Sequence, residues 1–102
     1  MVNFKEVDVN EAKKLIDERT VTIVDIRDPL AFQTSHIPNA ISVNDQNIDS
    51  FLKEADKNKT LICYCYHGFS SQSAAQFFSQ NGFAEVYSII GGFEEFNKYY
   101  PV

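Results

Sequence analysis

The sequence predicts an α/β fold in which a parallel sheet of about five strands carries helices on both faces. Short apolar segments that fit buried strands alternate along the chain with segments whose apolar residues recur at helical spacing. Residues 60–64 are apolar nearly throughout, as is typical of a strand covered on both faces, and they predict the central strand. Capping residues stand at the start of some of the helical segments, which supports the same alternation.

Other segments fit the remaining strands of this sheet. Residues 21–25 predict a second buried strand, residues 40–43 a short one, and residues 85–89 the last strand of the chain.

Helices are predicted between these strands and at the end of the chain. Asp8, with Glu11 three residues later, has the pattern of a capping box before a first helix. Asp28 before Pro29 predicts a short helix through about residue 33, and another helix is expected to begin near Gln72. The apolar faces of the longer helices are formed by Val9, Ala12, Leu15 and Ile16; by Ile48, Phe51, Leu52 and Ala55; by Ala74, Ala75, Phe77 and Phe78; and by residues of a terminal helix over 93–99.

Composition and charge limit the classes of partner. The 102 residues suffice for one domain, predicted over 1–102, and 44% of them are hydrophobic, so a core can form without metal or disulfide staples. The net charge of −5, without a stripe of Lys and Arg, argues against nucleic acid as a partner. No membrane segment is expected, because no apolar run is long enough. No signal peptide is expected either, because residues 1–6 lack a basic region followed by an apolar run.

Two cysteines, Cys63 and Cys65, are separated by one residue. On a strand their side chains would share a face, and a disulfide between them would distort the backbone. Reduced thiols fit better and indicate a cytoplasmic protein. Cys63 is expected to be a core residue. No set of His, Cys, Asp and Glu has metal-ligand spacing, so no metal or cofactor is predicted.

Cys65 is the candidate catalytic nucleophile. It stands at the carboxyl end of the predicted central strand, just before a loop that opens into a helix. Main-chain N–H groups and a helix N-terminus converge at such a position, where they stabilise negative charge and lower the pKa of a thiol. The thiolate is the nucleophilic form of cysteine, so this placement favours catalysis over packing.

The loop after Cys65 is predicted to bind the substrate, and it consists of Tyr66, His67, Gly68, Phe69, Ser70 and Ser71. Its amides can donate to an anionic sulfur, and Gly68 permits the backbone angles that bring them round that sulfur. Ser70 and Ser71 add hydroxyl donors, and one of the two is expected to cap the following helix. The two aromatic residues are expected to shape the pocket mouth or to expose aromatic surface to an acceptor protein. For His67 two roles stay open: a positive charge toward a dianionic substrate, or a solvent-exposed residue that binds through its N–H.

Four motifs occur in order, at residues 24–29, 36–41, 65–71 and 91–96. Their sequences are Val-Asp-Ile-Arg-Asp-Pro, His-Ile-Pro-Asn-Ala-Ile, Cys-Tyr-His-Gly-Phe-Ser-Ser and Gly-Gly-Phe-Glu-Glu-Phe. The series resembles the rhodanese family, in particular the small single-domain thiosulfate sulfurtransferases of the GlpE type. The resemblance spans essentially the whole chain and implies a rhodanese-like three-layer α/β/α domain.

The resemblance implies transfer of sulfane sulfur. The Cys65 thiolate would attack the outer sulfur of thiosulfate, release sulfite and carry the sulfur as a persulfide. A small thiophile (cyanide in an assay), a thiol or a thioredoxin-like protein would then accept the sulfur. The chain departs from many rhodaneses at Ser35 and Asn39, where they have Gly, and His67 is its only basic residue in the loop.

Three further polar residues are expected to have structural roles. Asp25 and Arg27 stand at the end of a predicted strand, the edge where α/β sheets bind ligands, yet the preferred interpretation is an ion pair that fixes neighbouring loops. His36 is expected to make a hydrogen bond within its His-Ile-Pro turn.

Two other functions stay open. Cysteine phosphatases and some arsenate reductases share this architecture, but their loop has an Arg six residues after the Cys, where this chain has Ser71. The other alternative is a non-catalytic or sulfur-relay binding module, although such modules often have the cysteine replaced. We expect a monomer or a weak homodimer, with the aromatic end at Tyr99 and Tyr100 available to a partner.

Overall fold

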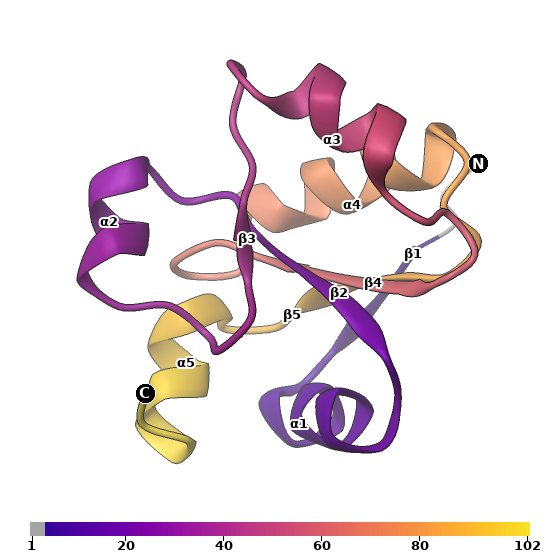
Figure 1. The fold of residues 1–102 in the computed structure, drawn as a ribbon. Helices are drawn as coiled ribbons and strands as arrows, with labels where there is room; N and C mark the ends of the chain where they lie inside the picture. Colours follow the sequence, from indigo (N-terminus) through magenta and orange to yellow (C-terminus); the bar gives the residue numbers. More distant parts are fainter. Residues whose placement is uncertain (1–3) are drawn as a thin grey trace.

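The structure, a computed structural model, describes residues 4–102, which form a parallel sheet of five strands in the order β1-β5-β4-β2-β3 (Figure 1). The strands are β1 (Phe4–Val7), β2 (Val21–Asp25), β3 (Ile41–Ser42), β4 (Thr60–Tyr64) and β5 (Val86–Ile89). All neighbouring strands pair in parallel, and β4 occupies the centre. The predicted fold class is confirmed. The expectation that residues 1–6 contain no signal peptide concerns a segment of which residues 1–3 lie outside the described part of the chain.

Helices cover both faces of the sheet. They are α1 (Val9–Glu18), α2 (Pro29–Thr34), α3 (Ile48–Glu54), α4 (Ser70–Gln80) and α5 (Gly92–Tyr99). Figure 1 shows α3 and α4 above the sheet and α1 and α5 below it, with α2 to the left, beyond β2. The predicted capping box starts α1, since Asp8 accepts from the Glu11 amide at 2.8 Å and Glu11 accepts from the Asp8 amide at 3.1 Å. Within residues 4–102, no helix has both the length and the apolar character needed to cross a membrane.

The side chains of β4 alternate between the two cores. Leu61 and Cys63 pack with residues of α3 and α4, whereas Ile62 and Tyr64 pack with residues of α1 and α5. All four side chains are fully buried. This two-sided burial explains the nearly continuous apolar run, and it fixes the carboxyl end of β4 as a rigid starting point for the loop that follows.

The structure differs from the sequence-based expectations by one residue at the bounds of some elements, and more substantially as follows. The edge strand β1 was not predicted, because only Val7 of its four residues is buried and the segment lacks a strand-like apolar pattern. β3 covers Ile41–Ser42 rather than residues 40–43. α4 begins at Ser70 instead of near Gln72, and the expectation that a serine caps it is wrong: Phe69 occupies the N-cap position, with no side-chain capping bond.

Candidate active site

Cys65 follows directly after β4, at the edge of the sheet where the carboxyl ends of the parallel strands meet. Its side chain is almost buried, with 7% exposed, and it lies at one wall of an open cavity of about 330 Å³. The cavity is lined by Ile26, Arg27, Asp28, Ala31, Cys65, Tyr66 and Ser70. A small substrate can therefore approach the sulfur between the active-site loop and the segment from Ile26 to Ala31.

The loop folds its amides toward the sulfur. Cys65 Sγ lies 3.1 Å from the amide nitrogen of Gly68 and 3.3 Å from that of Ser71, both of which donate to it. The chain turns at Gly68, whose φ of +96° lies in the left-handed region that favours glycine. Ser71 belongs to the first turn of α4, so the sulfur lies at the positive end of that helix.

Hydrogen bonding separates the acidities of the two thiols. Burial raises the pKa of Cys65, but bonds from the Ser71 hydroxyl and from the amides of Ser71, Gly68 and His67 outweigh it, and the pKa is lowered overall. For Cys63, burial raises the pKa strongly, the charge of Cys65 raises it further, and a main-chain hydrogen bond opposes this only in part. Cys65 is therefore the thiol that ionises more readily.

A pair of buried hydroxyls lies beneath the sulfur. Ser71 Oγ is 3.5 Å from Cys65 Sγ and 2.8 Å from Ser88 Oγ, and both serine side chains are 0% exposed. Sequence reasoning missed Ser88. The available signal was a polar residue at an inward position of the predicted strand 85–89, but nothing local connects it with a loop 17 residues earlier.

The start of α5 holds the active-site loop from below. The amide of Phe93 donates to the carbonyl of Cys65 at 2.8 Å, and the amide of Glu94 donates to the carbonyl of Tyr66 at 3.1 Å. A Cβ atom on Gly92 would lie 2.5 Å from that Cys65 carbonyl oxygen, so the two backbones approach too closely for a side chain. The fourth sequence motif is thus a support for the loop.

The predicted ion pair of Asp25 and Arg27 forms. Arg27 Nη2 lies 2.7 Å from Asp25 Oδ2, both side chains are buried, and Nη2 also donates to the carbonyl of Ser35 at 2.5 Å. The guanidinium lies 4.1 Å from the ring centroid of Phe93, which ties this pair to α5. Arg27 lines the cavity, but its charge is matched by Asp25, so it is not a free cation for a substrate.

His36 makes a structural hydrogen bond, but its partner belongs to α2 and not to the His-Ile-Pro turn as expected. Its Nδ1 lies 2.8 Å from the carbonyl oxygen of Phe32, and the two rings stack. Asn39, which replaces a common glycine, has a φ of +71°, a left-handed conformation that Asn tolerates. Ser35 is extended, so its position needs no glycine. Among residues 4–102, no group of three or more His, Cys, Asp and Glu side chains could hold a metal ion.

The remaining loop side chains point outward. Phe69 is 77% exposed and does not line the cavity, whereas Tyr66 is half-exposed and does. His67 is exposed, with Nδ1 3.3 Å from Glu94 Oε1. Of the predicted loop residues, Gly68 and Ser71 therefore donate to the sulfur, and the His67 amide also lowers the pKa of the Cys65 thiol. Tyr66 and Ser70 line the cavity, and the His67 imidazole stands beside an acidic partner.

Comparison with known proteins agrees with this geometry. The rhodanese-like domain family matches residues 8–99. A thiosulfate sulfurtransferase GlpE from Pseudomonas syringae is 44% identical over 101 residues, covering 99% of this chain and 94% of that protein. One from Vibrio cholerae is 41% identical over 98 residues, covering 96% and 92%. The crystal structure of a rhodanese-like domain protein from Staphylococcus aureus superposes with a TM-score of 0.80 at 26% identity, covering 91% of each chain.

Proposed function

This chain belongs to the rhodanese-like domain family, and we propose that it is a thiosulfate sulfurtransferase that carries sulfur as a persulfide on Cys65. The observation that carries the proposal is the convergence of the Gly68 and Ser71 amides on Cys65 Sγ, at 3.1 and 3.3 Å. Donors aimed at one sulfur atom stabilise a thiolate, and they suit the anionic sulfur species of this reaction.

In the first step, the Cys65 thiolate attacks the outer sulfur of thiosulfate. A new S–S bond forms to Cys65, the S–S bond of thiosulfate breaks, and its electron pair leaves with sulfite. The terminal sulfur of the persulfide then carries the negative charge. Amides of Phe69 and Ser70 stand at the open first turn of α4 without a hydrogen-bond partner among residues 4–102, so they are available to this second sulfur.

In the second step, a nucleophilic acceptor attacks the terminal sulfur, and the S–S bond to Cys65 breaks. Its electron pair returns to Cys65 as the thiolate. Cyanide leaves as thiocyanate, and a thiolate acceptor leaves as a new persulfide. The same loop amides hold the charge in both states of the enzyme, so no metal or cofactor is required by this sequence of steps.

We expect thiosulfate alone to add the mass of one sulfur atom to the protein, located on Cys65, and cyanide to remove it. Intact-protein mass spectrometry before and after each addition measures both events, with peptide mapping to identify the cysteine. Aryl phosphate should not turn over under the same conditions, because Ser71 stands where a phosphatase has its phosphate-binding Arg. A non-catalytic binding module would show no mass gain, and Cys65-dependent phosphatase turnover would contradict the assignment.

His67 acts through its main chain in this proposal. Its amide lowers the pKa of Cys65 together with the other donors, whereas its imidazole lies beside the Glu94 carboxylate, which offsets any positive charge. The resulting site holds its anionic substrate mainly with backbone donors.

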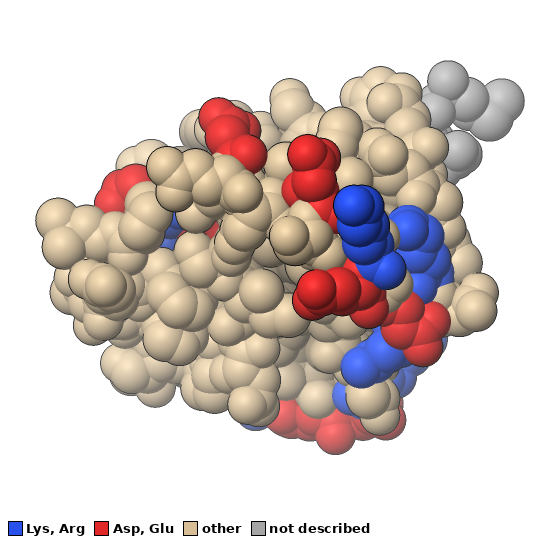
Figure 2. All heavy atoms as spheres, turned by 45° about the horizontal axis from the view of Figure 1, so that its top comes forward, with Lys and Arg blue, Asp and Glu red and all other residues tan. Residues whose placement is uncertain are grey.

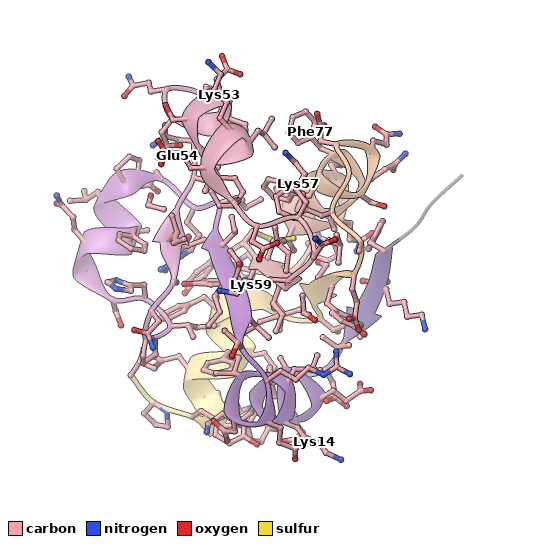
Figure 3. The ribbon with its side chains drawn as sticks, turned by 45° about the vertical axis from the view of Figure 1, so that its right-hand side comes forward. Lys14, Lys53, Glu54, Lys57, Lys59 and Phe77 are labelled. Carbon is pink, nitrogen blue, oxygen red and sulfur yellow. The ribbon has the colours of Figure 1, made fainter. Side chains whose placement is uncertain are left out.

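A protein acceptor fits the surface around Cys65. Leu30 and Phe69 are exposed, and each directly precedes a residue that lines the cavity, Ala31 and Ser70; Tyr66 itself lines it. Residues 28–52 and 60–97 contain no Lys or Arg, and most of the basic residues visible in Figure 2 gather at its right-hand side. Three of the lysines labelled in Figure 3, Lys53, Lys57 and Lys59, come from α3 and the segment after it. An acceptor would thus meet exposed apolar side chains whose charged neighbours include Asp28 and Glu94, a surface that fits a protein such as a thioredoxin-like acceptor.

Replacing Phe69 with alanine should raise the KM for a thioredoxin acceptor about tenfold and change the rate with cyanide less than about twofold. The side chain is 77% exposed and does not line the cavity, so only a large partner can contact it. Steady-state kinetics with both acceptors measure the effect. Tyr99→Ala is the control, since this aromatic residue is 55% exposed at the far end of α5. Equal effects of the two variants would contradict the proposed docking surface.

The proposal has three further parts. Residues 1–102 form a single rhodanese domain, the protein acts in the cytoplasm, and it works as a monomer or weak homodimer. Two free thiols, Cys63 and Cys65, suit a reducing compartment. Tyr100 packs on Phe96 within the chain, which leaves Tyr99 as the exposed aromatic residue for any weak self-association.

A further inference from the structure

Ser88 is a polar residue at a position where the fold would accept an apolar one. It lies on β5, opposite Cys63 of β4, and its side chain is fully buried. Within residues 4–102, its hydroxyl makes one hydrogen bond, to Ser71 Oγ at 2.8 Å. Ser71 Oγ is in turn 3.5 Å from Cys65 Sγ. The three groups form a short chain that ends at the reactive sulfur.

Counting the hydroxyl protons shows which group donates in each hydrogen bond of the Ser88–Ser71–Cys65 series. When Cys65 is the thiolate and Ser88 donates to Ser71, the Ser71 proton is free to point at Cys65 Sγ, and both hydroxyl protons have an acceptor. If Ser71 donates to Ser88 instead, the Ser88 proton has no acceptor among the described residues, and a buried donor is left unsatisfied. The first arrangement is also the one that a negative sulfur favours, because Ser71 then donates to the charge.

We propose that Ser88 is a positioning residue, whose hydroxyl turns the Ser71 hydroxyl toward the sulfur of Cys65. It does not touch the sulfur itself and acts only through Ser71. The inference rests on the proposed function, in that the thiolate and the persulfide of Cys65 are the states it stabilises. Among the donors to Cys65, the Ser71 side chain gives the largest single lowering of the thiol pKa, so the orientation of this hydroxyl has consequences for reactivity.

Other charged and titratable groups surround Cys65 and must stay constant in a test. Arg27 and Asp28 line the same cavity, His67 and Glu94 stand at the outer side of the loop, and Cys63 is buried on β4. Helix α4 contributes no titratable side chain. Substitution of Ser88 alters none of these groups, so a change in the acidity of Cys65 can be assigned to the hydroxyl pair.

The test is the rate of Cys65 alkylation by iodoacetamide as a function of pH, with mass spectrometry to identify the modified cysteine. In Ser88→Ala, the midpoint of the pH profile should move upward, and the rate at a pH below the midpoint should fall about fivefold. Alkylation reports the thiol whether or not sulfur is transferred, so failure of this inference is distinguishable from failure of the proposed function.

Two comparisons complete the design. Cys63→Ala removes one buried atom beside Ser88 and should leave the profile in place, since Cys63 donates nothing to Cys65. In a Ser71→Ala background, adding Ser88→Ala should have no further effect on the midpoint, because the route through Ser71 is already lost. The proposal is overturned if Ser88→Ala keeps the parental profile, or if the Ser88 effect persists undiminished without the Ser71 hydroxyl.

Discussion

Replacing Cys65 with serine should abolish sulfur transfer, lowering kcat/KM by on the order of a thousandfold or more. The loop amides and the Ser71 hydroxyl stay in place, but they then face a neutral serine hydroxyl. Its alkoxide form is inaccessible near neutral pH, and serine cannot form a persulfide. The assay is thiocyanate formation from thiosulfate and cyanide, with circular dichroism to verify the fold.

Cys63→Ser is the matched control for that experiment. Cys63 is buried in the core on the α3 and α4 side, and its Sγ donates to the carbonyls of Ser71 and Tyr87 at 3.4 and 3.5 Å. A serine hydroxyl can donate to the same carbonyls, so the variant should lose about 1 kcal/mol of stability and retain most of its activity. Equal loss of activity in both variants, with the fold intact, would show that the roles of the two cysteines are assigned wrongly.

The fold was predictable because its central strand carries an unambiguous pattern. The continuous apolar run of β4 and the capping residues Asp8 and Asp28 each specify an element locally, and the parallel sheet follows from their alternation. The edge strand β1 could not be predicted in this way, since its pairing with β5 depends on backbone hydrogen bonds that any residue can make. Local pattern therefore reports the centre of the sheet better than its edge.

The site was predictable only where it is contiguous in sequence. Cys65 and the loop amides come from one segment that joins a strand to a helix, and the geometry of that junction is general. Ser88 and the amides of α5 reach the loop through tertiary packing, over 17 residues or more of chain, and no local pattern encodes such contacts. Capping by a serine was predicted on local grounds and was wrong, because Phe69 occupies the N-cap position and Ser70 and Ser71 already belong to the first turn of α4. The Ser71 hydroxyl instead lies between Cys65 Sγ and Ser88 Oγ.

Gly92→Ala should show how much this packing matters. A Cβ at this position would lie 2.5 Å from the Cys65 carbonyl oxygen and 2.6 Å from that of Tyr66, and the φ of +61° adds strain. Backbone atoms cannot rotate away as a side chain would, so the loop must shift. We expect a loss of about 2–4 kcal/mol in the free energy of unfolding and a roughly hundredfold fall in kcat/KM, because the amides around Cys65 are displaced. Urea denaturation and steady-state kinetics measure the two effects.

Gly82→Ala separates this contact from backbone strain. Gly82 has a φ of +98°, so an alanine there bears left-handed strain as well, of about 1–2 kcal/mol, but its Cβ would meet only the flexible side chain of Lys57, at 3.3 Å. The position follows the end of α4, away from the sulfur, so Gly82→Ala should lower stability with kcat/KM nearly unchanged. If Gly92→Ala behaved in the same way, α5 would be an ordinary packing element. If only Gly92→Ala lost activity, the close approach of α5 to the Cys65 carbonyl would be what holds the loop amides on the sulfur.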